Sequence, residues 1–148
     1  LSNLGLRAVG STYTLTTSGN VSFSNDITIN HIIGGGLLPT GVAGAAAGTV
    51  ATVLLTKQKD SSMVIQLTTS ATGRVANAAV VNITFGRAYS SPPKVFLVPV
   101  NVNARGLNGG TLVYVPETSI TINGFSIFAG STVLGSVVVY QWSAFIIQ

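Results

Sequence analysis

Apolar and polar residues alternate along most of the chain, so that every second side chain in many short runs is apolar. These runs are rich in Val, Ile, Thr and aromatic residues, and they cover 12–17, 27–32, 49–56, 63–69, 79–85, 94–100, 111–115, 118–123, 125–129 and 136–147. A period of two over such residues is typical of β-strands. No stretch has the period of an amphipathic helix. The pattern predicts an all-β, antiparallel β-sandwich of the jelly-roll-like kind.

Turn-forming residues separate these runs. Asn, Asp, Gly or Ser lie at 18–20, 59–62, 108–110 and 123–125, and these are the residues that turns with positive φ favour. The sharpest of these signals predicts a tight hairpin centred on Asn123-Gly124.

The alternation also indicates which side chains are buried. Within 79–85, Val81, Ile83 and Phe85 share one face, while Asn82 and Thr84 lie on the other. A sheet with one face against water has this pattern.

The last run, 136–147, is apolar on both faces. Val137, Val139 and Phe145 lie on one face, and Val138, Tyr140, Trp142 and Ile146 on the other. We therefore expect this strand to be covered on both sides, once by the opposing sheet, with Trp142 in the core, and once by another subunit.

Prolines mark two positions in the strand pattern. Pro92 and Pro93 predict a corner between two core strands, because proline fixes φ and removes a hydrogen-bond donor. Pro99 predicts that the following strand ends there or lies at a sheet edge.

A Gly/Ala-rich segment divides the chain. We interpret residues 34–48 as a junction whose small side chains permit close backbone packing near a symmetry axis, with a simple linker as the alternative. The predicted organisation is a β-rich shaft or collar segment at 1–33, the junction at 34–48, and a sandwich domain at 49–148.

Composition adds a prediction about assembly. Only 7% of the 148 residues are charged and the mean hydropathy is +0.58, whereas about a quarter of an ordinary soluble domain is charged. Glycines and Pro39 interrupt the apolar stretch 32–56, and 118–148 is rich in β-branched residues, so neither favours a transmembrane helix and no membrane insertion is expected. Excess apolar surface can be buried between copies, which favours an obligate oligomer.

The ionisable residues do not suggest catalysis or nucleic-acid binding. The seven basic residues behind the net charge of +4 are scattered, and the stretch 57–60 (KQKD) is more typical of a solvated turn than of a phosphate site. Asp26, Asp60, Glu117 and the single His31 are isolated from one another along the chain. There is no cysteine, no phosphate-binding loop and no nucleophile elbow. We expect no enzymatic activity, no catalytic residue, no metal and no cofactor.

Four segments carry a resemblance to a known family. They are GGGLLPTGVAGAAAGT (34–49), VNITFGRAYSSPPKVFLVPVN (81–101), VYVPETSITINGFSI (113–127) and YQWSAFII (140–147). In this order they resemble the C-terminal, receptor-binding tip domain of tailed-bacteriophage tail fibres and fibre-like proteins. The likeness spans about residues 34–148 and leaves 1–33 outside it.

The resemblance implies a function outside the host cell. Such tips are homotrimers on the virion that contact other virion proteins and attach to a glycan or protein of the bacterial surface. Two alternatives keep the same fold: a purely structural virion protein, such as a head fibre, decoration protein or trimerisation cap, and the terminal domain of a polysaccharide-degrading tailspike.

The resemblance supplies no fixed binding residues, so the candidates come from residue chemistry. Asn101, Asn103, Arg105 and Asn108 offer amide and guanidinium donors for sugar hydroxyls or an anionic glycan. The alternative is that these asparagines satisfy turn geometry. Tyr89 and Tyr114 could stack on a sugar ring, with core or interface packing as the alternative.

Overall fold

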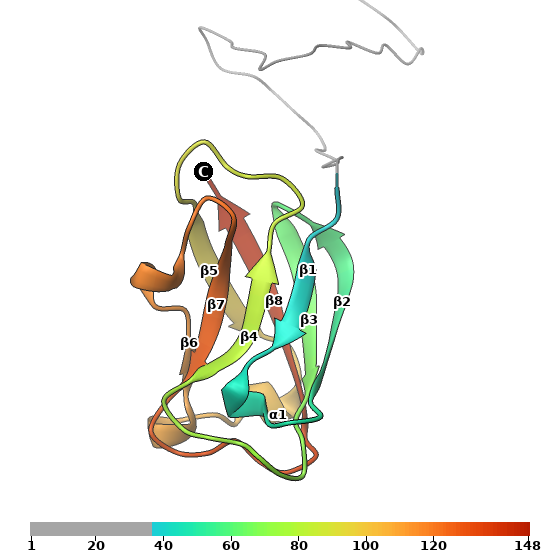
Figure 1. Cartoon of the computed structure of the whole chain (residues 1–148), viewed down its shortest axis with the longest axis vertical. Coiled ribbons are helices and arrows are strands. Elements are labelled where there is room, and N and C mark those ends of the chain that lie inside the picture. Colours follow the sequence, from blue (N-terminus) through green and yellow to red (C-terminus); the bar gives the residue numbers. More distant parts are fainter. Residues whose placement is uncertain (1–36) are drawn as a thin grey trace, which may run out of the picture. The chain divides into compact units, whose positions relative to one another are not determined.

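The computed structural model describes residues 37–148, which form two antiparallel sheets of four strands each with little helix (Figure 1). Sheet A contains, in spatial order, β1 (Thr40–Ala43), β4 (Ala79–Thr84), β7 (Gly124–Ala129) and β6 (Val113–Tyr114). Sheet B contains β2 (Thr52–Lys59), β3 (Ser62–Thr68), β8 (Val139–Ile147) and β5 (Lys94–Pro99). The helical pieces are single turns: η1 (Ala45–Ala47), α1 (Val102–Arg105), η2 (Gly109–Thr111) and η3 (Glu117–Ser119).

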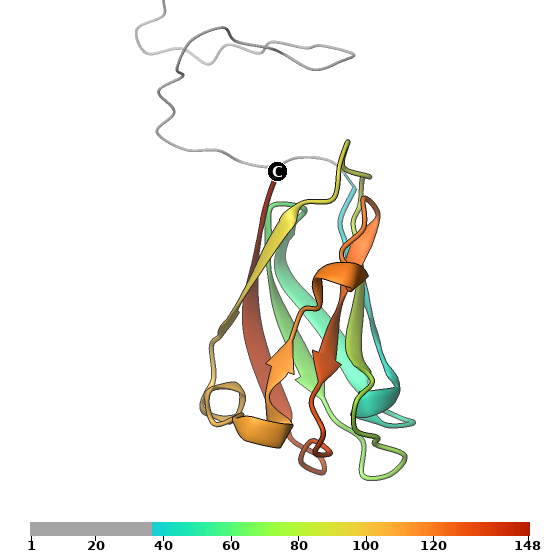
Figure 2. The same ribbon diagram turned by 90° about the vertical axis from the view of Figure 1, so that its left-hand side faces the viewer.

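The two sheets lie face to face as two layers, and one core fills the space between them (Figure 2). Its largest fully buried side chain is Trp142, which is 1% exposed and stacks on Tyr140 at 5.8 Å between ring centroids. The other large buried side chains come from both sheets, including Met63, Ile65, Leu67, Val81, Phe125 and Ile127. The prediction of an all-β chain of antiparallel sheets with Trp142 in its core is confirmed.

The predicted alternation matches burial where strands are central. Val81, Ile83 and Phe85 are buried, whereas Asn82 is half-buried and Thr84 exposed. The runs predicted at 63–69, 79–85, 94–100 and 125–129 correspond to β3, β4, β5 and β7. Pro99 ends β5, which is an edge strand, as its proline predicted. The runs predicted at 12–17 and 27–32 lie outside the described residues.

Other predicted strands differ from the structure. The run at 118–123 is not a strand: it contains η3 and a single bridge between Thr121 and Gly124. The hydroxyl Oγ of Ser119 donates to the carbonyl of Ser126 at 3.0 Å, so a side chain replaces strand pairing along this part of β7. Strands were also predicted at 49–56, 111–115 and 136–147, where the structure has β2, β6 and β8 with the narrower or shifted bounds given above.

The predicted hairpin turn is shifted by one residue. The Thr121 amide bonds the Gly124 carbonyl at 2.9 Å, so Ile122 and Asn123 are the central residues and Gly124 begins β7. A Cβ on Gly124 would lie 2.0 Å from the carbonyl oxygen of Ile83. Glycine is therefore needed here for close backbone approach rather than for a positive φ.

Part of the Gly/Ala-rich segment belongs to the sheet structure. β1 pairs with β4, and the Gly44 amide bonds the Val80 carbonyl at 2.9 Å. Ala46 and Ala47 in η1 are fully buried. Small residues are needed here because a Cβ on Gly44 would meet the backbone of Ala79 at 2.2 Å. Within the described chain, residues 40–47 thus pack as part of the domain that was predicted to begin at 49.

Candidate binding groove

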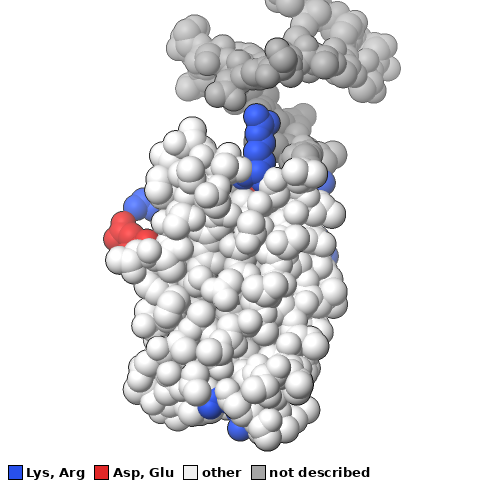
Figure 3. Space-filling view, in the orientation of Figure 1, with Lys and Arg blue, Asp and Glu red and all other residues white. Residues whose placement is uncertain are grey.

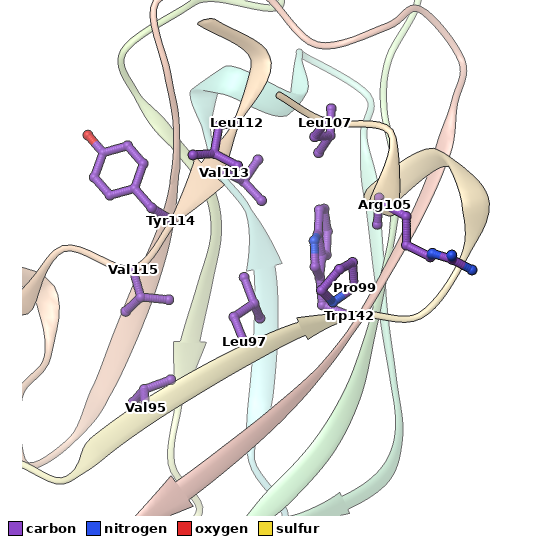
Figure 4. A pocket seen from close by; sticks show the side chains of 11 residues that line it. Val95, Leu97, Pro99, Arg105, Leu107, Leu112, Val113, Tyr114, Val115 and Trp142 are labelled. Atoms are coloured by element: carbon purple, nitrogen blue, oxygen red, sulfur yellow. The ribbon is translucent and has the colours of Figure 1, made fainter. Parts of the chain in front are cut away.

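A groove of about 330 Å³ lies between the edge strands β5 and β6, where the two sheets are not joined. Its lining is mostly apolar: Val95, Leu97, Pro99, Ala104, Arg105, Leu107, Leu112, Val113, Tyr114, Val115 and Trp142 (Figure 4). At the opposite edge of the sandwich, β1 approaches the side chains of β2 closely, since a Cβ on Gly41 would lie 3.0 and 3.3 Å from Val53 and Leu55.

Main-chain groups also border this groove. The Val100 amide bonds the Gln141 carbonyl at 2.8 Å. In an antiparallel pair, the backbone groups of successive residues point alternately toward the partner strand and away from it. The amides and carbonyls of Val95 and Leu97 therefore point away from β8. On the other edge, the Gly130 amide bonds the Leu112 carbonyl at 3.0 Å, which directs the backbone groups of Val113 away from β7. The groove therefore combines apolar side chains with hydrogen-bonding backbone.

Two of the predicted site residues lie at the rim of the groove. Figure 4 shows the side chains of Arg105 and Tyr114 on opposite sides, each directed away from the apolar centre formed by Leu97 and Val113. Tyr114 is 48% exposed, with its ring 6.5 Å from that of Phe128. Both side chains are placed to contact a large ligand that extends beyond the groove.

The three predicted asparagines shape the loop beside the groove. Asn101 caps α1: its Oδ1 accepts from the amides of Ala104 at 2.9 Å and Gln141 at 3.1 Å. The Nδ2 groups of Asn101 and Asn103 both donate to the carbonyl of Val139, at 2.8 and 2.9 Å. These side chains therefore hold the loop against β8.

Asn108 has a similar local role. Its amide donates to the Oγ1 of Thr111 at 3.2 Å, and that hydroxyl donates to the Asn108 carbonyl at 2.8 Å. Its Nδ2 lies 3.3 Å from the Gly106 carbonyl. The loop 101–111 is thus fixed by hydrogen bonds within the chain, as the turn-geometry alternative proposed.

Tyr89 lies at the other end of the sandwich. Its hydroxyl donates to the Asp60 carbonyl at 2.8 Å, and its ring packs edge-on against Phe85 at 4.8 Å. Burial raises the pKa of the Tyr89 phenol, and the negative charge of Asp60 raises it further. Ser62 near Asp60 pairs with Phe145, whereas Asn101 bonds Val139, so the length of β8 separates Tyr89 from the asparagine loop.

The structure therefore brings together Arg105, Tyr114 and the asparagine loop, and leaves Tyr89 apart. The apolar lining of the groove was not among the predicted site residues, although Pro99 had indicated the free edge. Among residues 37–148, no cluster of His, Cys, Asp or Glu could hold a metal ion. The groove is chemically suited to holding an apolar group or an extended chain.

Comparisons with protein-family models, with curated proteins and with solved structures give no significant match to this chain. Over the described residues, no helix is both long enough and apolar enough to cross a membrane.

Proposed function

We propose that this protein is a non-enzymatic viral adhesion module, the jelly-roll-like tip of a homotrimeric tailed-phage fibre. In this proposal the tip lies on the virion, outside the host cell, and binds a glycan or protein of the bacterial surface. The sequence resemblance over residues 34–148 is the reason for naming a fibre tip. The low fraction of charged residues supports assembly from several copies.

The observation that carries the proposal is the separation of the two ends of the domain. Leu37 lies beside Gly86, and the Nε2 of Gln148 donates to the Oγ of Ser90 at 2.7 Å, so both are at one end, here called the Leu37 end. The asparagine loop with α1, which includes Arg105 of the groove lining, is at the opposite end, here called the Asn101 end (Figure 1). In this proposal the Asn101 end, which lies opposite Leu37 within the domain, is the end that meets the bacterial surface.

A rigid loop at that end suits recognition. Loops on a rigid scaffold commonly carry binding residues, and a loop already held in shape loses little conformational entropy when a partner binds. Arg105 offers its guanidinium, and the groove beside it offers apolar area and backbone hydrogen-bonding groups.

One observation favours a second candidate, a structural virion protein without receptor binding. The amide groups of Asn101 and Asn103 are used within the chain, which leaves fewer polar side chains for a sugar. A loop of this kind would also serve a decoration protein or a cap that closes a fibre.

The test is binding of fluorescently labelled full-length protein to a panel of bacterial strains. We expect labelling of at least one strain, reduced about tenfold in affinity by Arg105→Ala, as for loss of one charge-assisted hydrogen bond. Arg87→Ala is the matched control, because Arg87 is exposed at the Leu37 end. If no strain is labelled, the structural alternative is favoured. Equal loss in both variants would show that overall charge, rather than the Asn101 end, governs attachment.

A further inference from the structure

An apolar patch covers the outward face of β5 and β8 in sheet B. It consists of Phe96, Val98, Val100, Val139, Phe145 and Ile147, whose exposed fractions lie between 37% and 58%. These residues alternate with Val95, Leu97, Tyr140, Trp142 and Ile146, which face the core. Both faces of β8 therefore carry apolar side chains, as the sequence predicted, although Gln141 and Ser143 are polar on the outer one; within a single chain only the inner face is covered.

The patch is continuous along β5 and across to Phe145. Phe96, Val98 and Val100 follow one another on the outward side of β5 and its continuation, and Phe96 lies directly opposite Phe145. On β8, Gln141 and Ser143 separate Val139 from Phe145. Taking the exposed fractions together, its apolar area is roughly 500 Å², near the upper end of the largest patch on typical monomers. With the polar residues between its members, it approaches the roughly 800 Å² that each partner buries in a standard interface.

The relief of this face suits close packing. A hollow of about 220 Å³ adjoins Phe145, bordered also by Val64, Ser143 and Lys57. The exposed phenyl ring of Phe145 thus lies next to a depression that could receive an apolar side chain of a facing molecule. Interfaces require this kind of shape complementarity at their centre.

Charge favours a second copy of the chain as the occupant. The protein carries a net charge of +4, so copies would repel if their basic residues faced each other. Among the outward residues of β5 and β8, only Lys94 is charged, and its Nζ lies 3.7 Å from Glu117. Gln66 and Gln141, at the middle of sheet B, already bond each other at 2.8 Å.

We propose that the outer face of β5 and β8 is the interface through which copies of this protein associate. This inference rests on the proposed function, because it assigns the surface at which the chains of the fibre tip would meet. A partner of any other kind would need to match a face whose charged groups are confined to its margins, at Lys94 and at Lys57 beside the hollow.

The experiment compares two charge insertions in the full-length chain by sedimentation at a series of concentrations. Phe96→Lys places a charge in the patch, and Val42→Lys is its matched control. Both residues point outward on edge strands, with 55% and 61% exposed, but Val42 lies on sheet A. We expect Phe96→Lys to raise the dissociation constant at least about 100-fold, toward a 15.1 kDa monomer, and Val42→Lys to leave it unchanged.

A measurement on the unmodified protein tests the interface even if the Phe96→Lys variant does not fold. Hydroxyl-radical footprinting should show less oxidation of Phe96 and Phe145 at concentrations where the protein is associated than where it is dissociated. Oxidation of Tyr114, which is exposed on sheet A, should not change. Association that Val42→Lys abolishes and Phe96→Lys spares would overturn the assignment, as would association without protection of the two phenylalanines.

The outcome is separable from that of the adhesion proposal. An unmodified protein that stays monomeric yet labels bacteria would disprove the interface and the homotrimeric assembly, and would leave only the binding to the bacterial surface standing. A stable multimer in which Phe96 is protected, but which labels no bacterium, would support the interface and disprove the adhesion proposal.

Discussion

The outer faces of the two sheets differ in chemistry although their inner faces share one core. On sheet A, the outward residues are mostly hydroxyl and amide side chains, and Asn82 accepts from the Oγ of Ser126 at 2.7 Å. On sheet B, Gln66 and Gln141 form a similar polar pair, but Phe96 and Phe145 lie beside it. Figure 3 shows that the face over sheet A has almost no charge, with charged groups at the ends and one edge.

The contrast teaches that low charge alone does not identify an interface. The strands of sheet A contain no charged residue, and the lysines of sheet B lie toward strand ends, at Lys57, Lys59 and Lys94. The high mean hydropathy of the chain therefore has two different sources. Sheet A avoids charge with neutral polar groups that water can solvate, whereas sheet B exposes phenyl and aliphatic groups that water solvates poorly. Only the second face gains substantially from being covered.

The largest expected change in the free energy of unfolding comes from the inner face of β8, and a substitution on its outer face provides the comparison. Trp142→Ala should lower the free energy of unfolding by about 3–5 kcal/mol, because it leaves a cavity in the core. Phe145→Ala, half-exposed three residues later, should cost less than about 1 kcal/mol in the monomer. Chemical denaturation at low protein concentration measures both. Similar losses would mean that the outer face of sheet B is already packed within one chain.

A second prediction concerns what holds the two sheets together at the Leu37 end. The Asp60 carboxylate, in the β2–β3 turn of sheet B, accepts from the amides of Gly86 at 2.8 Å and Arg87 at 3.0 Å, just after β4 of sheet A. Asp60→Ala should lower the free energy of unfolding by about 1–3 kcal/mol. Asp60→Asn keeps one acceptor oxygen and should lose less, as thermal unfolding can check; equal losses would point to charge rather than hydrogen bonding.

The polar pairs at the middle of each face should have similar energies. Asn82→Ala and Gln66→Ala each remove one side-chain hydrogen bond and should each cost about 0.5–1.5 kcal/mol. Paired denaturation curves test this. A much larger loss on sheet B would show that its face differs at the centre as well as in its flanking phenylalanines.

The smallest expected effect is on the free energy of unfolding at alkaline pH, and it comes from Tyr89 at the Leu37 end. The pKa of Tyr89 is raised in the folded protein, so its contribution to stability is complete below the unfolded pKa of about 10 and is lost as pH rises through the folded pKa. Tyr89→Phe should flatten the fall in the free energy of unfolding between about pH 9 and pH 12. An unchanged slope would assign that fall to other groups.

The sequence predicted the strands whose alternation coincides with burial. Val81, Ile83 and Phe85 follow this rule, and Trp142 was correctly placed in the core. The run 118–123 failed although Ile and Thr favour strands, because the Ser119 side chain bonds the β7 backbone where strand pairing was expected and Asn123 lies in the turn before Gly124. The buried turn at Ala46 and Ala47 depends on contact with β4, which no local pattern reveals.

The site was less predictable than the fold. Asn101 and Asn103 have suitable chemistry for binding sugars, but their partner is the carbonyl of Val139, far along the chain. The groove arises from the separation of β5 and β6, and its apolar lining has the same composition as the core. Of its rim, only Arg105 and Tyr114 could be proposed from residue type.

The hydrogen bond between Gln66 and Gln141 has a consequence for how the chain chooses its strand register. A strand with one apolar face is held in register because a one-residue slip would bury polar side chains. β8 carries apolar residues on both faces, with only Gln141 and Ser143 polar on the outer one, so its hydrophobic pattern discriminates less sharply against such a slip. The two amides face each other directly in the native pairing, at 2.8 Å, and a slip would separate them. This pair therefore helps the folding chain to distinguish its correct alignment from a neighbouring one of similar hydrophobic burial.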